Sequence, residues 1–150
     1  MICQGLVKSG KLTAITLFFP GETMKILGIS CSPRANGNTE IMVREALSKA
    51  EEEGAQTELV ALAQKNIAPC DACLSCRETG KCHKKDDMQD IYVKLLETDG
   101  VIFGSPVFYW TVTAQAKALI DRTFVFSKDY KLEGKAAGAV SYTHLTLPTN

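Results

Sequence analysis

The amino-acid sequence predicts an α/β fold in which a parallel sheet is doubly wound and covered by helices. Short apolar runs alternate along the chain with longer segments of helical periodicity, and this order implies right-handed βαβ units. The length of 150 residues, of which 45% are hydrophobic and 23% charged, suits one globular domain with a sizeable core. In such sheets ligands bind beyond the carboxyl ends of the strands, so the loops there are the places to look for a site.

The first strand–helix–strand unit is predicted near the start of the domain. Lys25–Ser30 is a short apolar run closed by small residues, as expected for a strand that is buried on both faces. Residues 38–53 are predicted to form a helix that Gly54 stops. Its apolar positions recur at i, i+3, i+4 and i+7: Val43, Ala46, Leu47 and Ala50. Residues 57–63 form the second predicted strand.

The alternation continues with a helix and a strand. Residues 86–98 are predicted as a helix in which Asp86 is the N-cap and Gln89, three residues later, completes a capping box. The apolar stripe of this helix comprises Met88, Ile91, Tyr92 and Leu95. Residues 100–104, which begin and end with glycine, form the third strand.

A last helix and strand complete the predicted domain. Residues 111–126 are predicted to be helical, and the alanine-rich residues 135–140 form the fourth strand. One face of this helix carries Val112, Ala116, Leu119, Ile120 and Thr123.

The two ends of the chain do not fit this pattern. Residues 12–20 form a short apolar run that faintly resembles a signal peptide, but it lacks a small-residue cleavage site. Because Met24 begins a clean strand, we hypothesise that the natural start is Met24 and that residues 1–23 are translated upstream sequence. Residues 141–150 have no helical period, and we interpret them as a non-native tail.

Charge and cysteine content narrow the function classes. The 17 basic and 17 acidic residues cancel, so nothing favours a nucleic-acid or anionic-membrane partner. No stretch approaches the roughly eighteen apolar residues that a membrane helix needs. Four of the six cysteines crowd into residues 68–85. This favours metal or redox chemistry in a reducing compartment, the cytoplasm, over a secreted disulfide scaffold.

The loop after the first strand carries the residue types of an anion site. It leads into a helix whose N-terminus offers unpaired N–H groups and the positive end of the helix dipole. Ser32 and Thr39 can donate hydroxyl hydrogen bonds, and Arg34 supplies positive charge. Gly37 is expected to let the backbone curl closely around an oxyanion. The sequence lacks the Walker and dinucleotide glycine motifs, and a capping-rich turn without a ligand is the alternative.

The loop after the third strand is apolar and aromatic. It consists of Pro106, Val107, Phe108, Tyr109 and Trp110. A flat ring system needs an apolar wall and backbone donors, and a proline-led turn with aromatic side chains provides both. The alternative is that the aromatic residues belong to the core. Three consecutive side chains cannot all face one core, so we expect at least one to border a pocket or a subunit interface.

The segment with four cysteines is a third candidate site. The candidate metal ligands are Cys70, Cys73, Cys76 and Cys82, in the spacing C-x2-C-x2-C-x5-C. Two-residue gaps let successive thiolates converge on one centre, and a four-iron cube takes four such ligands from a compact loop. Structural zinc more often uses two C-x2-C pairs that a longer loop separates. A [4Fe–4S] cluster is therefore favoured, while zinc and uncoordinated thiols stay open. We interpret His83 as a surface histidine and Cys31 as a small buried filler.

These segments resemble a known family. Residues 32–34 and 37–39 are similar to the FMN-phosphate loop of NADPH-dependent FMN reductases and iron–sulfur flavoproteins. Residues 105–110 and 114–122 resemble that family's S-P-V-Y-x-W and A-x-x-K-x-x-I-D-R segments, with Phe108 where the family often has tyrosine. The cysteine spacing resembles the compact cluster motif of iron–sulfur flavoproteins.

The resemblance covers residues 24–140 and implies a flavodoxin-like sheet of strand order 2-1-3-4, in which the family's fifth strand and last helix are missing. It implies that residues 106–110 line the isoalloxazine ring. The implied contacts to the FMN phosphate come from Ser32, Arg34, Asn38 and Thr39, and Asn36 is a further implied cofactor-binding residue. Because loops after neighbouring strands share one end of the sheet, we expect the cluster and the flavin to be close, within one subunit or across a dimer.

The sequence thus predicts an FMN-dependent oxidoreductase that passes electrons between NAD(P)H or a ferredoxin-type donor, FMN and a [4Fe–4S] cluster. The flavin carries the chemistry, so no catalytic side chain is predicted. Two alternatives are an NAD(P)H-dependent FMN or quinone reductase without a cluster and a non-catalytic flavodoxin-like electron carrier. The expected partners are a small-molecule or protein redox partner and further copies of this chain, in a homodimer or homotetramer, in the cytoplasm of a bacterium or archaeon.

Overall fold

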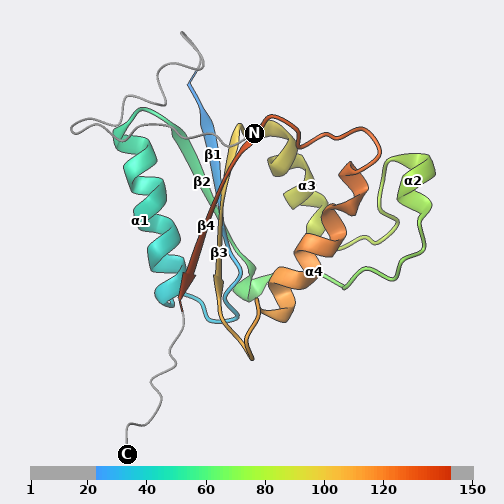
Figure 1. The fold of residues 1–150 in the computed structure, drawn as a ribbon, viewed down its shortest axis with the longest axis horizontal. Coiled ribbons are helices and arrows are strands. Elements are labelled where there is room, and N and C mark those ends of the chain that lie inside the picture. The colour runs from blue at the N-terminus through green and yellow to red at the C-terminus, as the bar shows by residue number, and fades with distance from the viewer. Residues whose placement is uncertain (1–22, 143–150) are drawn as a thin grey trace, which may run out of the picture.

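A computed structural model describes residues 23–142, in which a parallel four-stranded sheet carries helices on both faces (Figure 1). The elements are, in chain order, β1 (Lys25–Ser30), α1 (Asn38–Glu52), β2 (Gln56–Ala61), η1 (Leu62–Gln64), α2 (Ser75–Thr79), α3 (Met88–Glu97), β3 (Gly100–Pro106), α4 (Ala114–Arg122), η2 (Thr123–Phe126) and β4 (Ala136–Tyr142). The strand order is β2-β1-β3-β4 with every pairing parallel. The predicted fold class and strand order are confirmed.

The helix α4 begins later than the sequence predicts. Residue 111 was expected to be helical, but Thr111 pairs with Phe108 in an isolated bridge. Thr113 then caps the helix, because its hydroxyl oxygen accepts the N–H of Ala116 at 3.1 Å. The predicted helix also ends differently, since its last turn is the 3₁₀ segment η2.

The capping box predicted at the start of α3 is wrong. The helix begins at Met88 with Asp87 at the N-cap position. The Gln89 side chain does not reach back to Asp86 but donates to the carbonyl oxygen of Lys84 at 2.5 Å. The Asp86 carboxylate accepts the N–H of Met88 at 3.2 Å, and it accepts a shorter hydrogen bond, 2.7 Å, from the guanidinium of Arg122.

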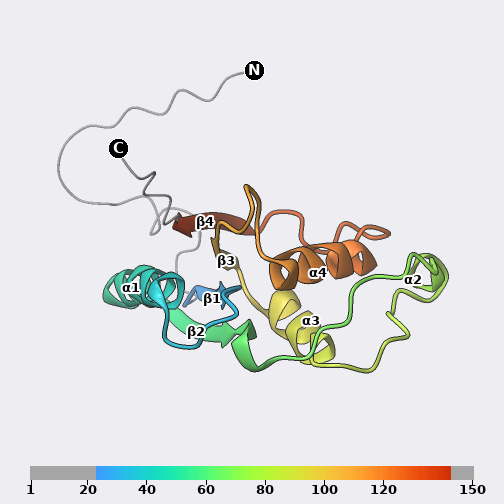
Figure 2. The same ribbon diagram turned by 90° about the horizontal axis from the view of Figure 1, so that it is seen from below.

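The two faces of the sheet carry different layers. In Figures 1 and 2, α1 covers one face, and α3 and α4 cover the other. The approach of α1 to the sheet depends on two glycines, because a Cβ on Gly28 would lie 2.7 Å from Val43 and one on Gly104 would collide with the same side chain. The core of the α3–α4 side contains Leu27, Ile29, Met88, Ile91, Leu95, Leu119 and Phe126. The predicted stripe of α3 is fully buried, whereas Ile120, predicted to face the core from α4, is exposed.

The strand β4 lies at one edge of the sheet. It runs past the predicted end at residue 140, since Ser141 pairs with Ser105 and Tyr142 with Pro106. Residues 1–22 of the predicted leader and 143–150 of the predicted tail lie outside the described residues, and the predicted domain boundaries stay predictions. Between residues 23 and 142, no helix is both long enough and apolar enough to span a membrane.

Candidate functional site

The two predicted cofactor loops meet at the carboxyl ends of β1 and β3. These strands are neighbours, with Ser30 opposite Gly104. The N–H of Cys31 donates to the carbonyl of Gly104 at 2.8 Å, and the hydroxyl of Thr113 donates to the carbonyl of Cys31 at 2.7 Å. The loop of residues 31–37 and the loop of residues 106–113 therefore lie side by side, as the topology predicts (Figure 1).

The first of these loops, residues 31–37, leaves the start of α1 open. Gly37 occupies the N-cap position, and no side-chain hydrogen bond caps the helix. The first-turn amides therefore point toward the loop, as in helix N-termini that bind anions. Ser32 in the loop and Thr39 in the first turn of α1 are buried. The other predicted contacts are all exposed: Arg34, Asn36 and Asn38.

The tight turn in this loop depends on Asn36 rather than on Gly37. Asn36 has φ 55°, in the left-handed region that asparagine tolerates better than most residues, while Gly37 has φ −81°. A Cβ on Gly37 would lie 3.5 Å from the carbonyl oxygen of Arg34, an ordinary contact, so the expected need for glycine is not met. The Ser32 hydroxyl oxygen accepts the N–H of Arg34 at 3.0 Å, which leaves its own proton free to donate.

Glu40, in the first turn of α1, stabilises this loop and was not among the predicted site residues. Its buried carboxylate accepts the N–H of Asn36 at 3.0 Å. Arg44 donates two hydrogen bonds to the same carboxylate, at 2.7 and 3.1 Å. These bonds lower the pKa of Glu40 below its ordinary value, against the effect of its burial. The i, i+4 spacing of Glu40 and Arg44 was a signal that could have identified this support.

The aromatic loop projects its side chains into solvent. Two backbone hydrogen bonds between Phe108 and Thr111, at 2.8 and 3.1 Å, close the turn. Tyr109 and Trp110 have φ 45° and 67°, an unfavourable conformation for such residues that often accompanies function. Their exposed fractions are 95% and 78%, and that of Phe108 is 47%. The alternative that the three aromatic residues belong to the core is therefore wrong.

The cysteine segment, residues 68–86, is a loop whose ends are joined. The N–H of Ala68 donates to the carboxylate of Asp86 at 3.0 Å. The residues that flank the segment are joined as well. The N–H of Asn66 donates to the Asp87 carboxylate at 2.6 Å, and the Asp87 N–H donates to the Asn66 carbonyl. The segment carries the unpredicted helix α2. In Figures 1 and 2 it extends beyond α3 and α4, away from α1. The expected closeness of cluster and flavin, within one subunit or across a dimer, stays a prediction.

All four cysteines of this segment line one cavity of about 810 Å³. Cys76 and Cys82 are partly buried and pack against the core, while Cys70 and Cys73 are exposed. The rest of the lining includes apolar side chains: Ile120, Phe124, Val125, Phe126 and Leu132. Cys31 lies elsewhere, in the core, where burial raises the pKa of its thiol to about 12. Its interpretation as a buried filler is confirmed.

The backbone between the cysteines turns sharply in each two-residue gap. Ala72 and Leu74 have φ 54° and 60°, a conformation that costs residues with a Cβ roughly 1–2 kcal/mol. Two donors reach the sulfur atoms: the N–H of Ala72 to Cys70 and the hydroxyl of Ser75 to Cys73, both at 3.5 Å. Hydrogen bonds to sulfur are a common feature of thiolate-ligated clusters.

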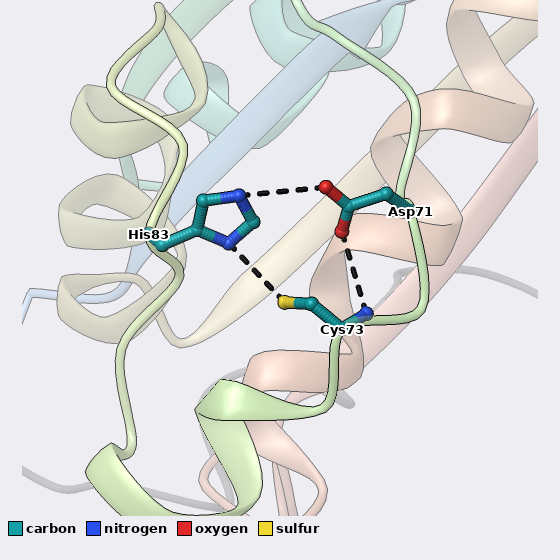
Figure 3. Close-up of side chains that lie close together, drawn as sticks. All are labelled: Asp71, Cys73 and His83. Atoms are coloured by element: carbon teal, nitrogen blue, oxygen red, sulfur yellow. Dashed lines mark hydrogen bonds and ion pairs between the residues drawn. The ribbon is translucent and has the colours of Figure 1, made fainter.

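A chain of close polar contacts joins three side chains of the segment (Figure 3). Nδ1 of His83 lies 3.2 Å from Sγ of Cys73, and Nε2 lies 3.4 Å from a carboxylate oxygen of Asp71. A hydrogen bond from Lys84 lowers the pKa of Asp71 to about 2. Ligand atoms of Asp71, Cys73 and His83 lie within 4.8 Å of one another. Because the two ring nitrogens face different partners, a single ion could use only one of them. His83 is exposed as expected, but it also contacts a predicted ligand.

Sequence comparisons place the chain among flavoproteins. Residues 24–146 match the family described as NADPH-dependent FMN reductase. An iron–sulfur flavoprotein of Methanocaldococcus jannaschii is 48% identical over 118 residues, which cover 79% of this chain and 61% of the relative. An iron–sulfur flavoprotein of Methanosarcina thermophila is 41% identical over 119 residues, which cover 79% and 62%. The chain thus spans about three-fifths of the length of these relatives.

Solved structures share the fold. A flavone reductase is 26% identical with a TM-score of 0.61, over 80% of this chain and 43% of that chain. RosB with bound 8-demethyl-8-formylriboflavin-5'-phosphate is 19% identical with a TM-score of 0.65, over 81% and 52%. Both likenesses extend over most of the sheet and helices described above.

Proposed function

The chain belongs to the NADPH-dependent FMN reductase family, and we propose that it is a flavin-dependent oxidoreductase in which bound FMN exchanges electrons with a [4Fe–4S] cluster. The observation that carries the proposal is the pairing of the open α1 N-terminus with the aromatic loop at the carboxyl ends of β1 and β3. Ligands of doubly wound sheets bind at this end. The electron donor in the proposal is NAD(P)H or a ferredoxin-type protein.

The residues of the two loops fit FMN. A phosphate needs hydrogen-bond donors and positive charge, and the loop offers open helix amides, hydroxyl groups and the exposed Arg34. The proposed phosphate contacts are Ser32, Arg34, Asn36, Asn38 and Thr39. The ring would lie against residues 106–110, whose exposed aromatic side chains offer the apolar surface that it needs. When bound, FMN supplies hydride acceptance and single-electron transfer, so the chain itself need only bind and orient it.

The cysteine segment fits a metal cluster. Four cysteines border one cavity, two left-handed residues turn the chain between them, and N–H and O–H donors reach two of the sulfur atoms. The proposed ligands are Cys70, Cys73, Cys76 and Cys82. The names of the two relatives, iron–sulfur flavoproteins, support iron over zinc. Four reduced cysteines and such a cluster suit a reducing compartment such as the cytoplasm.

The proposal includes a homodimer or homotetramer. In one subunit the cysteine segment extends beyond α3 and α4, away from α1 (Figures 1 and 2), and in the proposal a second subunit brings its cluster close to the flavin. The exposed Tyr109 and Trp110 offer apolar surface for such an interface beside the flavin. The redox partner would then be a small molecule or a protein that reaches either centre.

The test is an anaerobic absorption spectrum with FMN, iron, sulfide and zinc assays on the whole chain, after reconstitution with iron and sulfide. We expect a flavin spectrum and about four irons per chain. Cys73→Ser should lose the iron and keep the flavin. Cys31→Ala is the control for loss of a thiol outside the segment, because Cys31 is buried elsewhere in the core, and it should keep the iron.

Each other outcome selects an alternative. Flavin without iron or sulfide would favour an FMN or quinone reductase without a cluster. Both centres without reduction by NAD(P)H would favour a non-catalytic electron carrier. A chain that binds no flavin would refute the proposal.

A further inference from the structure

Arg122, the last residue of α4, has the most completely buried charge of the cysteine region. Its side chain is 1% exposed and pairs with Asp86, whose side chain is 8% exposed. The guanidinium donates from Nη1 to one carboxylate oxygen at 2.7 Å and from Nη2 to the other at 3.0 Å. It also donates from Nη1 to the carbonyl oxygen of Ala68 at 2.8 Å. From Nε it donates to the hydroxyl of Tyr92 at 3.2 Å, and this hydroxyl donates to the Arg122 carbonyl at 3.0 Å.

These contacts join the two ends of the cysteine segment to one side chain. Ala68 begins the segment and Asp86 ends it, and the Ala68 N–H also donates to Asp86. Arg122 is held in turn by Tyr92 of α3, whose ring packs edge-on against Phe126 with the ring centroids 5.4 Å apart. We call the joined ends of the segment, Ala68 and Asp86, its neck. The contacts with α3 and α4 hold this neck closed whether or not the cysteines bind a metal.

We propose that Arg122 is a positioning residue that closes the neck of the cysteine segment and so fixes the distance between its first and last metal ligands. Cys70 lies just after one end of the segment and Cys82 just before the other. Closing a loop costs conformational entropy, and a neck closed beforehand removes that cost from metal binding. This inference rests on the proposed role of the cysteines as metal ligands.

The chemistry of the neck requires arginine. Its planar fork contacts both carboxylate oxygens of Asp86 and still reaches the Ala68 carbonyl, whereas lysine offers a single point of donation. A buried ion pair is a poor source of net stability compared with apolar packing. The value of this one therefore lies in the geometry that it imposes on the two ends of the segment.

The experiment compares Arg122→Lys and Asp86→Asn with wild type by titration of the whole, reduced, metal-free chain with Co²⁺ under anaerobic conditions. Thiolate-to-cobalt absorption reports binding. We expect both variants to bind Co²⁺ roughly 10–100-fold more weakly, as is typical when a ligand-orienting contact is lost. The partly buried Cys76 and Cys82 should also react faster with an alkylating agent. Lys117→Gln is the matched control on the same helix, since Lys117 pairs with Asp121 at the surface, and it should match wild type.

Urea unfolding distinguishes the outcomes. Variants that unfold cooperatively like wild type and bind Co²⁺ with unchanged affinity would overturn the proposal. If both variants lose the whole fold, Arg122 stabilises the domain in general, and the specific role in the segment is refuted. If the wild type binds no Co²⁺, the proposed metal function fails by itself. The alkylation rates still decide in that case whether Arg122 closes the segment.

Discussion

The two candidate binding regions are built in opposite ways. In the phosphate loop, residues 31–37, the turn is held by contacts between residues two to four positions apart, such as Ser32 with Arg34 and Asn36 with Glu40. The first residue of the loop, Cys31, is also bonded to distant residues of the neighbouring strand and loop. The neck of the cysteine segment is held by contacts that span 36 and 54 positions, from Arg122 to Asp86 and Ala68. The turn of the first site is a local consequence of a strand that leads into a helix. The second exists only after α3 and α4 have packed.

Because different residues hold the two regions, we expect a substitution in one region to weaken ligand binding there and leave binding in the other unchanged. Packing of α1 on the sheet should control the phosphate loop, because this loop lies between β1 and α1. The geometry of the cysteine segment should depend on its left-handed residues, Ala72 and Leu74, and on the contacts of Arg122 with its two ends. Measurements of FMN and Co²⁺ affinity on the same variant separate the two.

The largest effect is expected for Gly104→Ala. The added methyl group would collide with Val43 of α1 and crowd Thr39 and Val140. Overpacking of this kind costs up to about 3 kcal/mol. Urea unfolding should report this loss, FMN affinity should fall, and Co²⁺ affinity of the folded fraction should not change. Gly138→Ala is the control, because no atom lies within 4 Å of the position that its added methyl group would take, and it should stay within about 0.5 kcal/mol. Equal stability of the two variants would contradict the packing argument.

The same contrast explains how far the sequence predicts this molecule. The parallel α/β architecture, the buried stripe of α3 and the anion-binding residue types near Ser32 follow from periodicity and local composition, whereas the strand order was implied by the family resemblance. The structure contains all of these elements. The Gln89 capping box failed because Asp86 is engaged by Arg122, and no local spacing encodes a partner 36 residues away. The exposed position of Ile120 has the same origin, since Arg122 takes a buried place on α4.

The cysteine spacing indicated ligands but not their surroundings. A C-x2-C pattern states which sulfur atoms can converge, yet the left-handed conformation of Ala72 and Leu74 cannot be inferred from residues that ordinarily avoid it. The contact of His83 with Cys73 also depends on how the loop folds back across ten positions. Tertiary structure therefore supplies the geometry of this region.

Ala72→Pro should damage the cysteine segment alone. Proline fixes φ near −65°, whereas Ala72 has φ 54°, and it also removes the N–H that donates to Cys70. We expect Co²⁺ affinity to fall roughly tenfold, with FMN affinity unchanged. Ala72→Gly, which adopts positive φ readily, is the matched control and should bind Co²⁺ as wild type does. Tight Co²⁺ binding by the proline variant would show that the observed turn is not required.

Asn36→Val tests the phosphate loop in the same way. Asn36 has φ 55°, and a β-branched residue there should cost about 1–2 kcal/mol in the free energy of unfolding. FMN affinity should fall because the loop loses its turn, while Co²⁺ affinity stays constant. Asn36→Gly also lacks the proposed side-chain contact but keeps the conformation accessible, so it should recover the stability and bind FMN more tightly than the valine variant. If valine and glycine bind FMN equally well, the turn does not position the phosphate contacts.

The smallest effect is expected from acid. Burial opposes ionisation of Asp86, but hydrogen bonds from Arg122 and the Ala68 N–H outweigh it and hold the pKa of Asp86 below its ordinary value. A carboxyl whose pKa is lower in the folded state contributes stability that is complete above its unfolded pKa of about 3.9 and is lost as the pH falls through the folded value. Wild type should therefore lose more stability than Asp86→Asn between pH 6 and pH 3.

Hydrogen exchange shows which region opens. Protonation of Asp86 weakens the neck, so exchange of the Ala68 N–H should accelerate in acid relative to the intrinsic rate. Glu40 also has a lowered pKa, mainly through its bonds from Arg44, and its protonation should expose the Asn36 N–H. Asp86→Asn should remove the acid dependence at Ala68 and leave it at Asn36, and Glu40→Gln should do the reverse. If either variant removes both, the two regions are coupled, and their separate construction is not reflected in their stability.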